Sequence, residues 1–309
     1  MKELWMQKVI EVKNLTKKFK DLTAVNNLDL NVYRGDIFGF LGPNGAGKST
    51  TIRMLMTLIN PTSGTIKIFD KPLKQKRNEI LKKVGAIVEK PDFYGYLSAY
   101  KNLEILGQIS GCDTSNKRIM EILETVGLET RAKSKVKTFS HGMKQRLGLA
   151  QALIHDPDLI ILDEPTTGLD PQGMKEIREL IIHLAKEKQK TIFLSSHILA
   201  EVELVANRMI IINKGTTVVE GTVQDLLNAT NLKVTFELDE IERAKNLLAE
   251  TQWHKKIESF GDYQILFLLE KEEISPLNKF LVEKGIGVHS IVPKRSLEEY
   301  FLHLTEKGA

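Results

Sequence analysis

From its start to about residue 222, the chain alternates between short apolar runs and longer amphipathic stretches. The apolar runs have the length of strands, and the stretches between them carry apolar residues at helical spacing. Strands that alternate with helices predict an α/β fold built on a mostly parallel sheet. The strands are expected at residues 8–13, 24–33, 37–41, 65–69, 84–88, 159–162, 191–195 and 209–213.

One segment inside this region lacks strand-like runs. From about 97 to 155 the pattern is helical, and Ile119, Ile122, Leu123 and Val126 fall on one face of a helix. This predicts a helical insertion, at about residues 91–155, within the α/β domain.

The pattern changes near Gly221. Apolar and polar residues alternate strictly over 232–239, which predicts a strand with one exposed face, and a helix at 241–250 and a strand at 264–269 follow. Ser275–Pro276 is expected to open a helix that ends at Lys284–Gly285, and Ser296 to open a last helix. The sequence therefore predicts a large α/β domain at 1–222 and a small α+β domain at 223–309.

Composition excludes some classes of protein and leaves others open. Of 309 residues, 42% are hydrophobic and 27% charged, as in a soluble globular protein, and no uncharged apolar run is long enough to span a membrane. The N-terminus does not have the pattern of a secretory signal peptide. A net charge of +4 is too weak to indicate a partner, and the single Cys112 fits a reducing cytoplasm as an idle thiol.

A glycine-rich stretch carries the first candidate chemistry. It follows the apolar run at 37–41, leads into a predicted helix and matches the phosphate-binding pattern G-x-x-x-x-G-K-[ST]. Its glycines allow consecutive N–H groups to turn around a polyphosphate, and the helix dipole favours the same anion. A nucleotide site is therefore predicted at Gly42, Pro43, Asn44, Gly45, Ala46, Gly47, Lys48, Ser49 and Thr50, in which Lys48 reaches the phosphates and Ser49 ligates Mg²⁺.

Polar residues follow two other predicted strands. Asp163 and Glu164 come directly after 159–162, and His197 comes after 191–195. Ligands of open α/β sheets bind beyond the carboxyl ends of strands, where all three would meet the glycine-rich stretch. Asp163 is then a candidate Mg²⁺ ligand, Glu164 a candidate general base and His197 a candidate sensor of the terminal phosphate. Phe19 fits core packing and stacking on a base about equally well.

Further motifs support a resemblance to a known family. The segment Ser140–His141–Gly142–Met143–Lys144–Gln145–Arg146 resembles the signature motif of ATP-binding-cassette ATPases, and Thr167–Gly168–Leu169–Asp170 resembles their D-loop. His197 resembles their switch histidine and Phe19 their base-stacking aromatic residue. The resemblance covers residues 8–222, and the tail is similar to the C-terminal extension of the subgroup that exports bacitracin-like antibiotics or peptides.

Membership would imply a fold, a reaction and partners. The family's nucleotide-binding domain hydrolyses ATP with Mg²⁺, and two copies pack head to tail, so that each signature contacts the ATP of the other subunit. That contact would fall to Ser140, His141, Gly142 and Met143, with Asp170 in the D-loop. The resemblance implies an ATPase subunit that powers export of a drug, antibiotic or peptide through separate transmembrane permease subunits. It would form a homodimer at the inner face of the cell membrane, on the cytoplasmic side, without binding nucleic acid.

Two departures from the family pattern bear on turnover. Glu89 replaces a usual Gln; a carboxylate there can also ligate Mg²⁺, and Glu is familiar in the bacitracin and lantibiotic-immunity subgroup. His141 and Met143 replace Gly and Gln in the signature, which is compatible with a slower ATPase. The alternative function is a soluble cassette ATPase acting on ribosomes or DNA; such relatives generally carry two cassettes or a long coiled coil, and this chain has neither.

Overall fold

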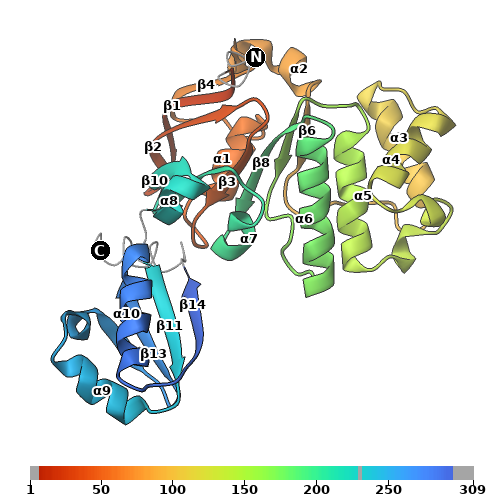
Figure 1. Cartoon of the computed structure of the whole chain (residues 1–309). Helices are drawn as coiled ribbons and strands as arrows, with labels where there is room; N and C mark the ends of the chain where they lie inside the picture. The colour runs from red at the N-terminus through yellow and green to blue at the C-terminus, as the bar shows by residue number, and fades with distance from the viewer. Residues whose placement is uncertain (1–6, 229–231, 295–309) are drawn as a thin grey trace. The chain divides into compact units, whose positions relative to one another are not determined.

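A mostly parallel sheet lies at the centre of the N-terminal part of the structure (Figure 1). The structure is a computed structural model that describes residues 7–228 and 232–294. Within the first range, six strands pair in the order β10-β9-β3-β8-β7-β6, all parallel except β10 against β9. The strands are β3 (Ile37–Leu41), β6 (Val84–Ile87), β7 (Leu159–Leu162), β8 (Thr191–Ser196), β9 (Arg208–Asn213) and β10 (Thr216–Thr222). The predicted α/β architecture is confirmed.

Strands β3, β7 and β8 are buried at every residue, because the sheet is covered on both faces. They are neighbours in the sheet and run parallel, so the residues that follow them meet at one edge. Gly42, Asp163 and His197 therefore lie at the same edge of the sheet, as the sequence predicted.

A second, antiparallel sheet pairs in the order β2-β1-β4-β5. Leu28, Leu30 and Val32 are fully buried on it, as their alternation predicted. The first strand runs past the predicted Lys13 to Phe19, because shifts of register let pairing continue beyond the break in the hydrophobic pattern. Its strands are β1 (Lys8–Phe19), β2 (Leu22–Tyr33), β4 (Ser63–Ile68) and β5 (Lys71–Pro72).

The predicted helical segment consists of helices that pack beside the parallel sheet (Figure 1). Ile119, Ile122 and Leu123 are buried on one face of α4, as predicted. Ser98 caps α3 and Ser115 caps α4 by accepting hydrogen bonds from backbone N–H groups. The helices of this segment are α3 (Ala99–Ser110), α4 (Asn116–Thr125) and α5 (His141–Leu153), with 3₁₀ turns η2 (Glu129–Arg131) and η3 (Val136–Thr138). Helix α6 (Pro171–Lys186) comes later in the chain, after β7.

The remaining helices of this region are short. Helix α1 (Lys48–Leu55) begins inside the glycine-rich stretch, with Gly47 as its N-cap. Helix α2 (Leu73–Leu81) connects β5 to β6, and α7 (Leu199–Glu203) connects β8 to β9. Helix α8 (Val223–Asn228) follows β10.

The chain divides into two compact units between Val223 and Gln224. In residues 232–294 four antiparallel strands pair in the order β12-β13-β11-β14, and two helices pack on the sheet face that carries Val234, Phe236 and Phe267. The predicted α+β class of this part is confirmed. Its elements are β11 (Leu232–Leu238), α9 (Ile241–Ala249), η4 (Gln252–Lys256), β12 (Ile257–Phe260), β13 (Gln264–Leu269), α10 (Lys271–Glu283) and β14 (Val288–Lys294).

Two predictions for this unit need correction. Helix α10 begins at Lys271 instead of at Ser275–Pro276, because Glu270 and Glu273 form a capping box upstream. Pro276 therefore lies inside the helix. Strands β12 and β14 were not predicted, because neither shows strict alternation. The helix predicted from Ser296 lies outside the described residues.

Candidate functional site

The glycine-rich stretch forms a tight loop between β3 and α1. Gly47 is the N-cap of α1 with φ +106°, and a Cβ there would come within 2.5 Å of the carbonyl oxygen of Ala24. A Cβ at Gly42 would come within 2.4 Å of the carbonyl oxygen of Ile212. Only glycine fits at these two positions, because the backbone of neighbouring strands approaches the loop so closely.

Lys48 is almost fully buried beneath this loop. Its Nζ donates to the carbonyl oxygens of Gly42 at 2.8 Å and Pro43 at 3.2 Å, and lies 3.3 Å from Oε1 of Glu164. A buried ammonium requires such partners. Lys48, predicted to bind the phosphates, thus forms an ion pair with Glu164, the predicted general base.

Glu164 lies at the centre of a small polar network. Its Oε2 accepts a hydrogen bond from Oγ1 of Thr167 at 3.0 Å and lies 3.1 Å from Nδ1 of His197. Burial alone would raise the pKa of the Glu164 carboxyl, but the Thr167 hydrogen bond and the charges of Lys48 and His197 bring that pKa below its usual value. The carboxylate is therefore ionised near neutral pH.

The backbone of Glu164 is also unusual. Its φ is +47°, a conformation that a non-glycine side chain adopts only at a cost of about 1–2 kcal/mol. The N–H group donates to Oγ of Ser195 at 2.9 Å, and the hydroxyl of Ser195 donates to Oδ1 of Asp163 at 2.6 Å. Ser195 thus holds both carboxylate residues at the end of β7.

The predicted Mg²⁺ ligands are not gathered into one cluster. Asp163 is buried and Ser49 lines the cavity described below, whereas Glu89 is mostly exposed and forms an ion pair with Arg53. Over residues 7–228 and 232–294, no group of three or more His, Cys, Asp or Glu side chains could hold a metal ion. Ser49 and Asp163 nevertheless have the oxygen chemistry that Mg²⁺ prefers.

A cavity of about 430 Å³ opens beside the loop. Its lining combines the loop and Glu164 with side chains that the sequence did not single out, those of Leu22 and Lys214 among them. The lining residues are Leu22, Thr23, Ala24, Asn44, Gly45, Gly47, Lys48, Ser49, Thr50, Glu164 and Lys214. A concave site with convergent N–H groups, a buried lysine and a carboxylate can bind a polyphosphate and activate a water molecule.

Phe19 does not line this cavity. Its ring is half exposed, with Nζ of Lys17 at 4.8 Å from the ring centroid, and Leu22 faces it across the β1–β2 pair. Leu22 is the apolar residue at the cavity wall. Stacking of Phe19 on a base remains a prediction.

The signature residues lie apart from this cavity and next to the D-loop. Ser140 caps α5 by accepting from the N–H of Met143 at 3.2 Å, and Nε2 of His141 lies 3.4 Å from the carbonyl oxygen of Thr167. Asp170 caps α6 by accepting from the N–H of Gly173 at 2.9 Å. Neither Gly142 nor its neighbours line the nucleotide cavity of their own chain.

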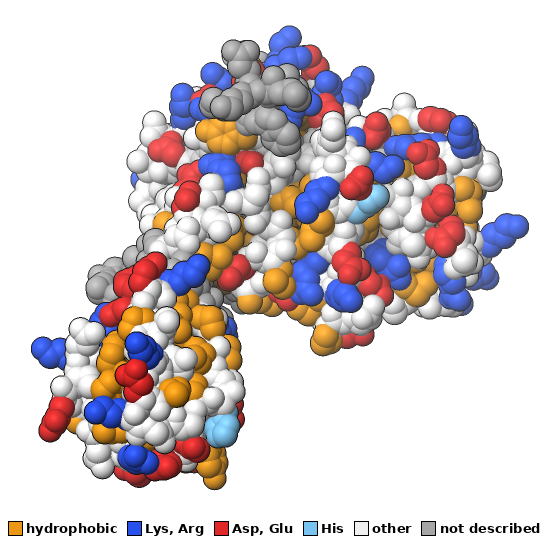
Figure 2. Space-filling view, viewed as in Figure 1, with side chains coloured by type: hydrophobic (Ala, Val, Ile, Leu, Met, Phe, Trp, Pro, Cys, Tyr) orange, Lys and Arg blue, Asp and Glu red, His pale blue; other side chains and the backbone are white. Residues whose placement is uncertain are grey.

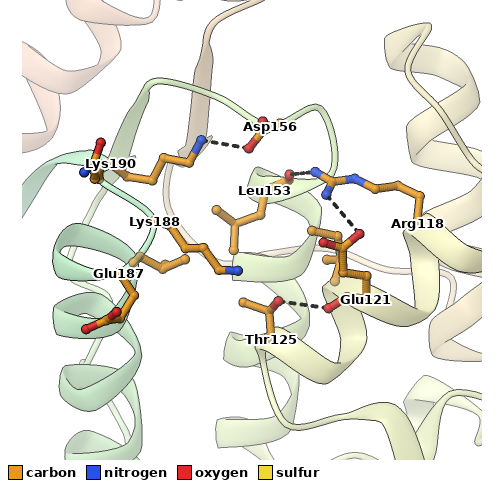
Figure 3. A pocket seen from close by; sticks show the side chains of 11 residues that line it. Arg118, Glu121, Thr125, Leu153, Asp156, Glu187, Lys188 and Lys190 are labelled. Atoms are coloured by element: carbon orange, nitrogen blue, oxygen red, sulfur yellow. Dashed lines mark hydrogen bonds and ion pairs between the residues drawn. The ribbon is translucent and has the colours of Figure 1, made fainter.

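A second cavity, of about 400 Å³, lies among α4, α5 and α6 and shares no residue with the first (Figure 3). Its charged side chains are largely paired: Arg118 with Glu121, and Lys190 with Asp156 at 2.7 Å. Arg118 also donates to the carbonyl oxygens that end α5. This cavity is held by interactions between its own walls and contains none of the predicted site residues.

Comparisons with known proteins agree with this geometry. Residues 25–167 match the family model described as ABC transporter. The chain is 45% identical to the bacitracin transport ATP-binding protein BcrA of Bacillus licheniformis, over 98% of this chain and 99% of that protein. It is 44% identical to the lantibiotic transport ATP-binding protein SrtF of Streptococcus pyogenes, over 74% of this chain and 99% of that protein.

A solved structure is also similar to this chain. It is the dimeric post-hydrolysis state of the ATP-binding cassette MJ0796 bound to ADP and phosphate, with a TM-score of 0.62 and 28% identity. The match covers 69% of this chain and 98% of that one.

Proposed function

This chain belongs to the ABC transporter family, and from that premise we propose that it powers export of a drug, antibiotic or peptide through a separate membrane-spanning partner. It is an ATP-binding, ATP-hydrolysing subunit. The observation that carries the assignment is the position of Glu164, 3.3 Å from the loop lysine and 3.1 Å from His197 at the edge of the cavity.

In this proposal the loop from Gly42 to Thr50 holds the phosphates of ATP with its N–H groups and with Lys48. Binding would transfer the Lys48 ammonium from its present carbonyl and carboxylate partners to phosphate oxygens. Glu164 would then accept the proton of the attacking water, and His197 would hold the carboxylate in place. The left-handed backbone at Glu164 fixes the direction in which this side chain points.

Mg²⁺ would neutralise charge on the phosphates when bound. Ser49 and Asp163 would hold it, since one lines the cavity and the other is a buried carboxylate next to Glu164. Glu89 could join them only after it leaves Arg53.

The signature residues support a two-subunit site. Ser140, His141, Gly142 and Met143 do not line the nucleotide cavity of their own chain, so we assign them to the ATP of a second copy. Over the described ranges, 7–228 and 232–294, the structure has no helix long and apolar enough to cross a membrane. We assign residues 1–222 to the ATPase domain and 223–309 to an accessory domain, at the inner face of the membrane beside a permease.

The names of two relatives support the proposed class of exported molecule. They are transport ATP-binding proteins for bacitracin and for a lantibiotic. We therefore place the cargo of this chain's partner among drugs, antibiotics and peptides.

A mixing experiment tests the two-subunit site. Lys48→Ala disables the phosphate loop, and Gly142→Asp places a negative charge where the partner's nucleotide would lie. A Cβ atom at Gly142 would lie 3.9 Å from the side chain of Leu169, an ordinary contact, so the second variant should fold. Each variant alone should release little phosphate from ATP, and a mixture should recover activity because one composite site is intact.

The controls are the wild-type chain and each variant assayed alone. Activity in the wild type without recovery in the mixture would contradict the shared site. Absence of ATP hydrolysis in the wild type, with and without its membrane partner, would contradict the function itself.

A further inference from the structure

The turn between β9 and β10 brings one more cation to the nucleotide cavity. It spans Asn213–Thr216, and Lys214 at its tip lines the cavity together with residues of the phosphate loop. We propose that Lys214 forms a second phosphate-binding position, which holds the part of the polyphosphate that ATP and ADP share. This inference rests on the proposed function and adds a residue outside the motifs considered above.

The turn is anchored to both walls of the cavity by its backbone. The N–H of Gly215 donates to the carbonyl oxygen of Ala46 in the phosphate loop at 3.0 Å, and its carbonyl oxygen accepts from the N–H of Asn26 at 2.8 Å. Two such hydrogen bonds fix the turn against the loop on one side and β2 on the other.

Close packing makes this position rigid. Gly215 has φ +80°, and a Cβ there would come within 2.8 Å of the carbonyl oxygen of Ala24. The same carbonyl lies 2.5 Å from a Cβ built on Gly47. Strand β2, the phosphate loop and the turn therefore meet at Ala24, where their backbones pack closely.

Lys214 itself has a left-handed backbone, with φ +48°. Asn, Asp and Gly adopt this conformation more readily than Lys does. The strain makes this position a candidate functional site, although strain alone assigns no role.

The charged side chains that line the cavity indicate a role for Lys214 in binding an anion. Three charged side chains line it: Lys48, Glu164 and Lys214. Lys48 and Glu164 compensate each other at 3.3 Å, whereas the Lys214 side chain has no hydrogen bond or ion pair with any described residue. The uncompensated charge of the cavity is thus the Lys214 ammonium, and a polyphosphate is the ligand that would pair with it.

The anchoring also indicates which phosphates it reaches. Lys48 is held at the start of the loop, by Gly42, Pro43 and Glu164, where hydrolysis is assigned. The turn that carries Lys214 is held through Gly215, by its hydrogen bond to Ala46 and its close packing on Ala24 in β2, the strand that also carries Leu22. The two lysines therefore bind different parts of one nucleotide, and Lys214 is assigned to the part that remains in ADP.

The test uses Lys214→Asn, which removes the charge and suits the left-handed backbone. Lys214→Arg keeps the charge. Lys20→Asn is the matched control, since Lys20 is also an exposed turn lysine with φ +44° but does not line the cavity. Dissociation constants for ATP and for ADP are measured with Mg²⁺ on the full chain, at low and high salt, after thermal unfolding has shown that each variant is folded.

Lys214→Asn should weaken ATP and ADP equally, about 3–10-fold, and the effect should shrink at high salt. Lys214→Arg and Lys20→Asn should stay within about twofold of wild type. Unchanged affinities in Lys214→Asn, or weaker ATP binding with normal ADP binding, would overturn the inference while the proposed function stands. A wild-type chain that binds neither nucleotide would overturn both.

Discussion

The two units of the chain differ in the kinds of side chain that they bury. In the unit that ends at Val223, buried polar or charged side chains include Lys48, Asp163 and Ser195, at the edge where β3, β7 and β8 end. In residues 232–294 every buried residue is apolar, from Val234 and Phe236 in β11 to Leu281 in α10. The first unit contains a polar site inside its packing, whereas the described part of the second has an apolar core alone.

Backbone strain follows the same division. All non-glycine residues with positive φ in the described ranges lie in the first unit, Glu164 and Lys214 among them. Such a backbone conformation costs free energy, and two of these residues, Glu164 and Lys214, line the cavity. Burial of polar groups and strained backbone thus point to the same unit as the place of chemistry. On the molecular face drawn in Figure 2, in contrast, basic and acidic side chains are intermixed and indicate no site.

The largest expected effect is on turnover. Glu164→Gln keeps the shape of the side chain but removes the base, so phosphate release should fall about 10³-fold while ATP still binds. Steady-state phosphate release and equilibrium ATP binding measure the two effects. Glu179→Gln, on the exposed surface of α6, is the control and should be active. An unchanged rate in Glu164→Gln would remove this residue as the base.

A core substitution tests the independence of the second unit. Phe236→Ala removes a fully buried ring that packs on Phe267, and should destabilise this unit by about 3–5 kcal/mol. ATP binding should stay normal, since no site residue lies there. Urea unfolding with a parallel ATP titration checks both.

The matched variant in the first unit is Phe193→Ala. It removes a ring of the same size from β8, next to Ser195, and should weaken ATP binding as well as stability. Equal loss of ATP binding in both variants would break the distinction between the units.

The next effect concerns the buried lysine. Lys48→Ala should raise the dissociation constant for ATP about 10–100-fold, because charge-assisted hydrogen bonds to phosphate are lost. Equilibrium dialysis with ATP measures it. Normal affinity would contradict the assignment of the loop.

The smallest effect is a dependence of stability on pH. Because the pKa of Glu164 is lowered by folding, its contribution is complete above the usual value of 4.5 and is lost as pH falls through the lower, folded-state pKa. The difference in unfolding free energy between wild type and Glu164→Gln should shrink as pH falls below about 4, by about 1 kcal/mol or less. A difference that grows on acidification would contradict the ion pairs at Glu164.

Much of the site followed from the order of strands alone. Gly42, Asp163 and His197 each come directly after a buried strand, and parallel neighbours bring such positions to one edge. The same rule could have found Lys214, since β9 runs parallel to β3 and ends just before it. The strand ending at Asn213 was recognised, but the lysine after it belonged to no known motif.

Other contacts had no signal in the sequence. The hydroxyl groups of Thr167 and Ser195 reach Glu164 and Asp163 through loop geometry, which hydrophobic periodicity does not encode. The ion pair of Glu89 with Arg53 depends on side-chain direction in the same way. In the second unit, strand β12 was missed because an exposed edge strand needs no apolar alternation.

Thr167 contacts both the proposed general base and the signature motif of its own chain. Its hydroxyl donates to Glu164, and its carbonyl oxygen lies 3.4 Å from His141 of the signature. In the proposed dimer, Glu164 serves the nucleotide of its own chain and His141 that of the partner. A single threonine then links occupancy of the two sites, and such linkage is reciprocal: whatever the first ATP changes in the affinity of the second, the second changes equally in the first.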